Sequence, residues 1–263
     1  MKKYFLFLCF AMSLHASTLD LGFGVGTMFY PDYLGSKNSN TLFIPYPYVS
    51  YKSDKLSIDR EGLQQKLLHY GDFSVELSAG GSLPLKSSGI REGMNDLDPS
   101  VEFGPALLYT VHQDEQLSLK IDMPIRAVLS SDFKSVDYRG YIYELRGELE
   151  YKVDDYELEF HTGFVLSDSQ YHNYLYGVGA EEETAQRASF HAKGGYTGYK
   201  NSLGLSKRFE HLWAGAFVRH YALDGSVIAQ SPLTEKDSAI YGGVFIAYIF
   251  DDDVTRSIKN WLE

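Results

Sequence analysis

The sequence predicts an all-β fold: an antiparallel transmembrane β-barrel that is closed, has about 12 strands (range about 10–12) and encloses a polar lumen. Three observations carry this prediction. Residues 141–166 alternate between an apolar and a charged face, on arms of about 9–11 residues, the length of a bilayer-crossing strand. The chain begins with the features of an export signal. No later apolar run is long enough for a spanning helix, so a membrane form would have to be a barrel.

The hairpin of residues 141–166 shows the alternation best. Its first arm places Tyr141 and Tyr143 on one face and Glu144 and Arg146 on the other. Period two indicates a β-strand, because successive side chains point to opposite faces. Lipid outside and a polar lumen inside would produce this pattern, and so would a soluble antiparallel sheet with one wet face. The hairpin alone leaves both open.

The N-terminal segment decides more. A short basic region with Lys2 and Lys3 precedes an apolar run of residues 4–14, and small residues follow, with Ala16 as the expected cleavage site. Cys9, the one cysteine, lies inside this segment, so the mature chain would have no thiol chemistry. We therefore expect an exported protein with a single domain. Its divisions are residues 1–16 as signal peptide, 17–250 as outer-membrane β-barrel and 251–263 as C-terminal periplasmic tail.

Composition agrees with a barrel whose two faces differ. The chain has 21 Tyr, 16 Phe and 24 Gly, with 44% hydrophobic residues. Glycines at positions 22, 24 and 26 form a row on one strand face, which we expect to face the lumen and let the strand bend. The formal charge of −11 becomes more negative when the two signal lysines leave. This charge disfavours nucleic acid as a partner.

The remaining strands follow from the same periodicity. The expected strands cover residues 18–29, 41–51, 55–70, 73–83, 101–109, 117–129, 170–178, 194–209, 212–223 and 240–250, in addition to the two arms of the hairpin. Long polar loops are expected at residues 84–99 and 179–189.

Two of these strands are irregular. Residues 41–51 contain Pro45 and Pro47, which cannot donate to a ladder, so we expect an irregular strand or a seam. Residues 55–70 are consistent with one long strand bulged near Gly62, or with two short strands. The tail after the last strand is either frayed or a short docking helix that begins near residues 251–253.

The sequence contains no motif for catalysis, cofactor binding or metal binding. It has no Gly-x-Ser-x-Gly elbow, no His-Glu-x-x-His pair and no Cys/His cluster. His161 is the most suggestive histidine, since it is expected beside Glu157 and Glu159 in the lumen. We interpret it as one member of a salt-bridged interior, and we predict that the protein is not an enzyme.

The alternation assigns a set of charges to the lumen, because an Arg or Lys that faces lipid costs about 2–4 kcal/mol at the midplane. These residues are Lys120, Asp122, Arg126, Glu144, Arg146, Glu148, Glu150, Glu157, Glu159 and His161. Two interpretations remain. The charges fill the interior as a packed ion-paired network, or they line an open pore that favours cations modestly because acids are in excess.

Several segments together resemble the MltA-interacting protein (MipA/OmpV) family of Gram-negative outer-membrane proteins. The matching segments are residues 31–36 (PDYLGS), 45–51 (PYPYVSY), 97–98 with 102–104 (LD and EFG), 171–178 (YHNYLYGV), Arg187, 194–196 (GGY) and 231–233 (SPL). They occur in family order across the mature chain. The tail departs from the family's usual aromatic ending.

The resemblance implies an outer-membrane barrel without cofactors, in contact with outer-membrane lipid. For the founding members it implies a scaffold that links a lytic transglycosylase to a murein synthase; other relatives resemble porins, so a narrow, weakly cation-selective porin is the alternative. The family motif, with a role in loop structure or partner binding, comprises Asp32, Tyr33, Gly35, Ser36, Tyr174, Tyr176, Gly177, Arg187, Ser231 and Pro232. The aromatic residues would equally suit a girdle at the membrane interface.

Overall fold

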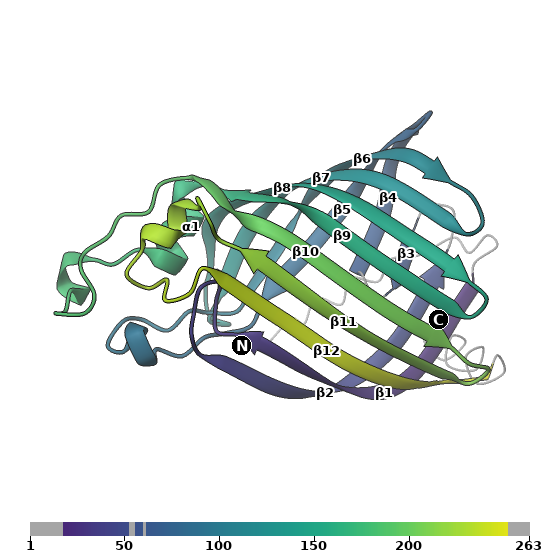
Figure 1. Cartoon of the computed structure of the whole chain (residues 1–263), viewed down its shortest axis with the longest axis horizontal. Coiled ribbons are helices and arrows are strands. Elements are labelled where there is room, and N and C mark those ends of the chain that lie inside the picture. Colours follow the sequence, from purple (N-terminus) through teal and green to yellow (C-terminus); the bar gives the residue numbers. More distant parts are fainter. Residues whose placement is uncertain (1–17, 53–55, 60–61, 252–263) are drawn as a thin grey trace, which may run out of the picture.

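Antiparallel strands make up most of the described chain (Figure 1). The structure is a computed structural model that describes residues 18–52, 56–59 and 62–251. Every strand pairing in these residues is antiparallel, which confirms the predicted all-β antiparallel class. The predicted signal peptide, and the predicted tail from residue 252 onward, lie outside the described residues.

The elements follow one another along the chain with few interruptions. The strands are β1 (Thr18–Pro31), β2 (Ser39–Lys52), β3 (Leu56–Asp59), β4 (Gly62–Tyr70), β5 (Phe73–Ser82), β6 (Ser100–Gln113), β7 (Leu117–Ser131), β8 (Val136–Val153), β9 (Tyr156–Ser167), β10 (Gly195–Arg208), β11 (Leu212–Ala222) and β12 (Ser238–Ile249). The helical segments are α1 (Ser169–Tyr176) and the 3-10 turns η1 (Gly89–Arg91), η2 (Ala180–Glu182) and η3 (Val227–Gln230).

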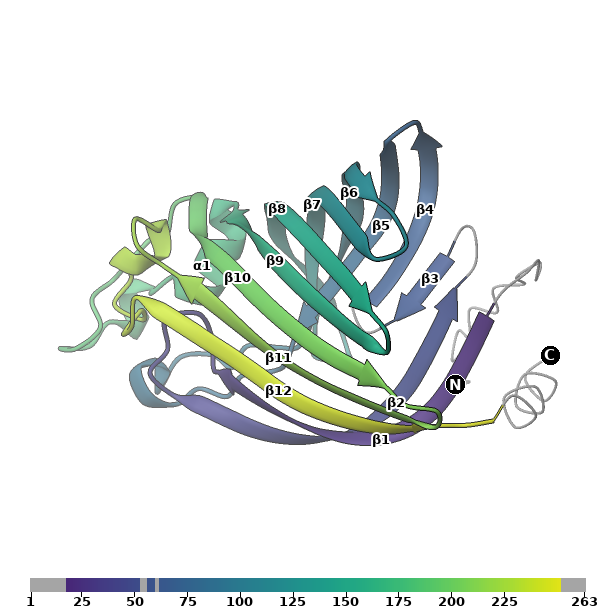
Figure 2. The same ribbon diagram turned by 45° about the vertical axis from the view of Figure 1, so that its right-hand side comes forward.

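The order of neighbouring strands runs from β1 through β12, β11 and so on down to β2, which pairs with β1 again. The eleven strands other than β3 have 9 to 18 residues. The short β3 connects β2 and β4, pairing with β2 at two positions and with β4 at four (Figure 2). The region expected to be one bulged strand or two short ones therefore contains two strands.

The small number of pairs between β2 and β3 explains why β2 can contain two prolines. On its β1 side the strand pairs along its whole length, whereas on its other side the described pairs are Tyr51 with Ile58 and Lys52 with Ser57. Pro45 and Pro47 therefore lie where the second edge has no paired neighbour among the described residues. Such an edge tolerates residues that lack an N–H group.

The two faces of the strands differ as the alternation predicts. On β8, Tyr141 and Leu145 are 40% and 47% exposed, while Ile142 and Glu144 between them are buried. Large apolar side chains are exposed in the same way on the other strands, for example Phe23, Phe103, Phe164, Leu203 and Ile246. An exposed apolar outer face and a polar inner face are typical of strands in a membrane barrel.

The two ends of the barrel differ in their connections. Residues 32–38, 83–99, 132–135, 168–194 and 223–237 connect strands at one end, which we call the loop end. At the other, the turn end, the connections are residues 71–72, 114–116, 154–155 and 209–211. Helix α1 and the loops gather at the left in Figure 1, and the tight hairpins lie at the right.

The predicted strand at residues 170–178 is wrong, because these residues contain helix α1. Asp168 caps the helix by accepting a hydrogen bond from the Tyr171 backbone N–H at 2.9 Å. Such a cap satisfies a donor that the first turn leaves without a partner. His172 and Tyr176, one turn apart, are both buried. An aromatic run this short does not distinguish period two from the helical period.

Candidate functional site

Charged residues of neighbouring strands pair across the inner face of the barrel. Register places Asp122 of β7 opposite Arg146 of β8, and their side chains form an ion pair of 2.5 Å. The same guanidinium lies 2.8 Å from Glu148, and His161 of β9 lies 3.7 Å from Glu148. His161 therefore belongs to an ion-paired row.

Closer to the loop end, Glu144 is the centre of a second group. Its carboxylate pairs with Arg126 of β7 and Lys200 of β10, and lies 3.8 Å from Arg146. Arg126 also donates to Glu102 of β6 at 3.1 Å. We call these two groups together the charged wall: Glu102, Asp122, Arg126, Glu144, Arg146, Glu148, His161 and Lys200.

The other predicted lumen charges lie nearer the turn end. Lys152 pairs with Glu150 and, at 3.0 Å, with Glu157. Glu150 lies opposite Glu159 in the register, and Lys120 lies opposite Glu148. The inner faces of β7, β8 and β9 thus bring the predicted charges together.

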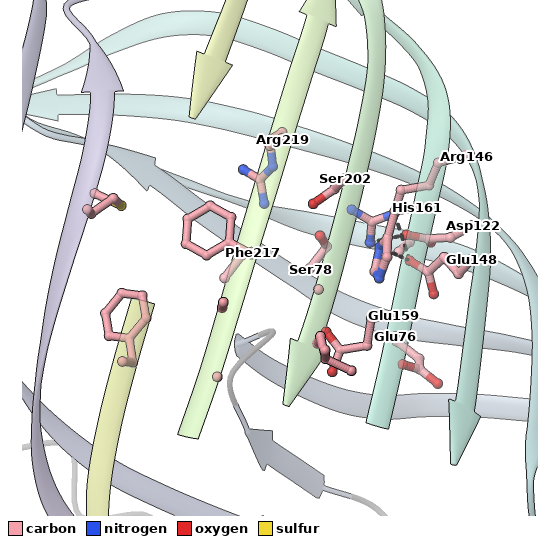
Figure 3. A pocket seen from close by; sticks show the side chains of 18 of the residues that line it. Glu76, Ser78, Asp122, Arg146, Glu148, Glu159, His161, Ser202, Phe217 and Arg219 are labelled. Carbon is pink, nitrogen blue, oxygen red and sulfur yellow. Dashed lines mark ion pairs between the residues drawn. The ribbon is translucent and has the colours of Figure 1, made fainter. Parts of the chain in front are cut away.

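A cavity of about 450 Å³ occupies the interior beside the charged wall (Figure 3). Its lining comes from β1, β2, β5, β6, β7, β8, β9, β10, β11 and β12. Glu76, Asp122, Glu148 and Glu159 line it together with Arg126, Arg146 and Arg219. Its size is within the range of ligand sites, about 300–1,000 Å³.

The cavity has a second, apolar side, which we call the aromatic wall: Tyr46, Trp213, Phe217 and Phe245. Glycines make room for these rings. A Cβ on Gly26 would lie 2.1 Å from the Phe245 ring, and one on Gly215 would lie 2.3 Å from the Trp213 ring. Figure 3 shows Phe217 beside Arg219, with the labelled carboxylates on the other side. Of the glycine row expected to bend a strand, Gly26 therefore also leaves the space that the Phe245 ring occupies.

The long loops pack together at the loop end and form what we call the loop cap. Its buried apolar residues are Tyr33, Tyr176, Val178, Leu223, Ile228 and Leu233. The Tyr33 hydroxyl donates to the Leu233 carbonyl at 2.9 Å, and the Tyr176 hydroxyl donates to the Leu34 carbonyl at 3.0 Å. These bonds join the first, fourth and fifth loops of this end. Burial raises the pKa of Tyr33 to about 12.

Two buried arginines connect further loops within the cap. Arg187 donates to the carbonyls of Glu182, Ile90 and Glu92 at 2.6 to 3.1 Å. Arg91 donates to the Leu175 carbonyl at 2.7 Å, and its guanidinium lies 5.9 Å from the centre of the Tyr33 ring. Burial lowers the pKa of Arg91. Hydrogen bonds to backbone carbonyls therefore stabilise both buried arginines.

A buried histidine attaches helix α1 to the barrel. The Nδ1 of His172 lies 2.7 Å from the Lys193 carbonyl, and Nε2 lies 2.8 Å from the Thr197 hydroxyl. The carbonyl can only accept, so Nδ1 donates and Nε2 accepts from Thr197. Burial lowers the pKa of His172. No part of His172 is exposed, so its two hydrogen bonds hold the loop in place, and the side chain does not face a substrate.

The remaining family-motif residues also lie in the loop cap. Asp32 accepts from Asn40 at 2.5 Å, and the Gly35 carbonyl accepts from the backbones of Glu235 and Lys236. Ser36 and Gly177 lie at turns of the first loop and of α1. Tyr174 donates to the Asp98 carbonyl at 3.3 Å, and Ser231, followed by Pro232, donates to the Tyr176 carbonyl at 2.8 Å.

Several residues of the interior were missed from the sequence. Arg219 and three residues of the aromatic wall, Trp213, Phe217 and Phe245, were assigned no role, whereas Arg91 was expected to shape a loop, as its contacts within the cap confirm. Alternation of aromatic residues with glycines on the inner face of β11 and β12 could have indicated the aromatic wall. Within residues 18–52, 56–59 and 62–251, no group of His, Cys, Asp and Glu has the arrangement of a metal site. No helix of that part of the chain is long and apolar enough to cross a membrane.

Comparison with known proteins identifies relatives. A family model described as MltA-interacting protein MipA matches residues 23–250. Outer membrane protein OmpV of Vibrio cholerae and outer membrane protein Omp26La of Vibrio anguillarum are 35% and 33% identical to the chain over 92 residues. Each alignment covers 34% of this chain and 34% of the relative, so the chain spans about a third of the curated relatives it matches. Among solved structures, the NanC porin is 9% identical with a TM-score of 0.42, over 86% of this chain and 98% of the porin.

The family model covers most of the chain, from the first strand to the last, and both relatives are named outer membrane proteins. The resemblance predicted from the sequence motifs is thereby confirmed: the chain belongs to the MltA-interacting protein MipA family and is an outer-membrane protein.

Proposed function

We propose that the protein is a closed, twelve-strand outer-membrane barrel with a polar lumen, and that this lumen is a narrow passage for small solutes that weakly favours cations. The internal cavity of about 450 Å³ is the observation that carries the proposal. Four carboxylates and three guanidiniums line it. An excess of negative charge along a pore lowers the energy of a cation in it relative to an anion.

The orientation follows from the connections between strands. Outer-membrane barrels have short periplasmic turns and longer extracellular loops. The loop cap would then face outward, and the tight hairpins would face the periplasm. The exposed apolar side chains of the strands would contact outer-membrane lipid. The two relatives are named outer membrane proteins and the family is named for an interacting protein, and these names support a non-enzymatic role.

Single-channel recording of the refolded protein in a planar bilayer tests this function. We expect discrete conductance steps and, in a potassium chloride gradient, a reversal potential of the sign that indicates cation preference. A folded barrel that conducts no ions would contradict the proposal, because a lumen continuous with both sides must carry current.

Charge neutralisation tests the cause of the selectivity. The double variant Glu148→Gln with Glu159→Gln removes two carboxylates from the cavity, and we expect the cation preference to fall or reverse. The matched control, Glu181→Gln with Glu183→Gln, removes two exposed carboxylates of the loop end. An equal change of cation preference in the two double variants would mean that the cavity carboxylates do not determine the selectivity.

A second function is supported by the family description itself, MltA-interacting protein. We propose that the barrel is also a scaffold that binds a lytic transglycosylase, and through it a murein synthase, at the periplasmic end. Capture of a purified transglycosylase by the full chain, compared with a chain ending at Asp251, tests this role. Loss of capture on deletion would support binding by residues 252–263. Unchanged capture would assign it to the hairpin turns, and no capture by the full chain would rule the scaffold out.

A further inference from the structure

The cavity differs from an ordinary ion-paired interior because two buried polar atoms that line it lack partners. Most buried polar groups in proteins are hydrogen-bonded, so each exception requires an explanation such as a ligand or water. Arg219 Nε and Asp122 Oδ1 are both buried without a hydrogen bond to any described residue. Arg219 and Asp122 both line the cavity.

Arg219 differs from the other two arginines of the cavity. Arg126 pairs with Glu102 and Glu144, and Arg146 pairs with Asp122 and Glu148. Arg219, on β11, forms no ion pair with a described carboxylate. Its opposite neighbours in the register are Ser202 and Tyr241, neither of which is acidic. In Figure 3 its guanidinium lies beside Phe217, away from the labelled carboxylates. The interior therefore holds an uncompensated cation next to the aromatic wall.

Asp122 supplies the opposite charge on the charged wall. One of its carboxylate oxygens pairs with Arg146 at 2.5 Å, and the other, Oδ1, has no hydrogen bond among the described residues. An ionised carboxylate has about four lone-pair sites, so it can accept a further donor without losing Arg146. The strand order separates β7 from β11 by three strands, so the two free groups approach the cavity from different parts of its lining.

From these contacts we propose that the cavity is a binding site for a small dipolar solute with an ammonium group, a carboxylate and an apolar or aromatic body. The carboxylate pairs with Arg219, the ammonium donates to Asp122 Oδ1, and the body lies against Phe217 and Phe245. This inference names a solute class for the passage proposed above. Binding in detergent requires no conduction, so either proposal can fail without the other.

The two tryptophans of the chain make binding measurable. Trp213 lines the cavity, and Trp261 lies outside the described residues. In a Trp261→Phe background, Trp213 is the one remaining fluorophore of its kind, and a nitroaromatic ligand that binds beside it quenches its emission. The probes are 4-nitrophenylalanine, which carries both charges, 4-nitrophenylacetate, which carries the anion, and 4-nitrophenethylamine, which carries the cation.

We expect saturable quenching with the zwitterion bound at least about tenfold more tightly than either singly charged probe, because each of those probes lacks one of the two charged hydrogen bonds. This comparison uses the barrel with its interior unchanged, so it does not depend on the folding of a cavity variant. Equal affinity for the three probes, or no saturable quenching, would overturn the proposal and leave water as the partner of the two free atoms.

Variants then assign each charge. Arg219→Gln should weaken the zwitterion about tenfold or more and remove its advantage over the amine, while Asp122→Asn should remove its advantage over the acid. Arg208→Gln is the matched control, because that guanidinium pairs with Asp20 at 2.6 Å and does not line the cavity. A folded Arg219→Gln barrel that binds the zwitterion as tightly as the control would overturn the site.

Discussion

The charged wall and the loop cap both bury guanidinium groups, and they neutralise them by different means. In the wall, Arg126 pairs with carboxylates of the two neighbouring strands, and Arg146 pairs with Asp122 of β7 and Glu148 of its own strand. In the cap, the hydrogen bonds of Arg187 and Arg91 go to backbone carbonyls, and the two side chains hold separate loops together. The stability of the charged wall therefore depends on pairing opposite charges on the sheet, whereas that of the loop cap depends on the position of a few hydrogen-bond donors.

This difference predicts which substitutions each region tolerates. Removal of one charge from the wall leaves an opposite charge buried without compensation, and the cost reaches the whole barrel because the strands carry it. Removal of a donor from the cap leaves buried carbonyls without a hydrogen bond. The loss of stability should be confined to the loops, because a loop can open while the strands at its two ends stay paired. Substitutions of Glu144, Arg187 and His172, each with a control substitution, test this contrast.

The largest effect is expected from Glu144→Gln. The Glu144 carboxylate pairs with Arg126 and Lys200, both buried, and lies 3.8 Å from Arg146. Loss of its charge should lower the free energy of unfolding by about 3–5 kcal/mol, the usual cost of breaking a buried ion pair. The measurement is urea unfolding of the refolded barrel in detergent.

Glu150→Gln is the control for Glu144→Gln. Glu150 also belongs to the inner face and pairs with Lys152, but its side chain is 33% exposed. Solvent screens this pair, so we expect a loss below about 1 kcal/mol. Similar losses in the two variants would mean that the buried group around Glu144 does not act as a unit.

An intermediate effect, confined to the cap, is expected from Arg187→Lys. Lysine keeps the charge, but an ammonium cannot reproduce the planar fork that reaches Glu182, Ile90 and Glu92. At least one buried carbonyl loses its donor, at a cost of about 1–3 kcal/mol. Limited proteolysis should cut residues 83–99 and 179–194 at least about tenfold faster, whereas the urea midpoint of the barrel should not change.

Arg139→Lys provides the comparison for that variant. Arg139 stands at the loop end, where it lies 3.1 Å from the half-exposed Asp137, donates to the Ser130 hydroxyl at 2.7 Å and stacks on the Tyr174 ring of α1. None of these contacts reaches residues 83–99 or 179–194. We expect little change in loop cleavage for it. If Arg187→Lys lowered the unfolding midpoint of the barrel as much as Glu144→Gln does, the separation between cap and wall would be wrong.

The contrast also explains how much the sequence could predict. The charges of β7, β8 and β9 were assigned to the inner face because period two needs nothing beyond neighbouring residues. Cross-strand partners such as Asp122 and Arg146 then follow from the hairpin register. What alternation does not contain is the side-chain geometry that leaves Arg219 Nε without a partner.

The loop cap was beyond prediction for a different reason. Its contacts join residues far apart in the chain, such as Tyr33 with Leu233, 200 positions away. A polar loop that packs against other loops has the same local composition as a loop in solvent, so residues 179–189 were expected only as a loop. The family-motif residues were found by resemblance alone, and the structure places them in the cap.

The smallest effect, and the one that depends on pH, is expected at His172. Burial lowers its pKa in the folded protein, so the unfolded loop binds a proton more readily than the folded one. Stability therefore falls as the pH drops below the ordinary histidine pKa of about 6.5, at up to about 1.4 kcal/mol per pH unit, until the folded pKa is reached. At neutral pH both states are uncharged and the contribution of His172 is fully present.

Acidification from pH 7 to pH 5 should accordingly speed cleavage of residues 168–194 more than unfolding of the barrel. His172→Gln removes the titrating group and should make the cleavage rate independent of pH in this range, whereas His191→Gln, which removes an exposed histidine of the same loop, should keep the wild-type profile. The same acid acceleration in His172→Gln as in the wild type would assign the titration to another group. The histidine that attaches α1 to the barrel would then hold the cap by its hydrogen bonds without making it sensitive to pH.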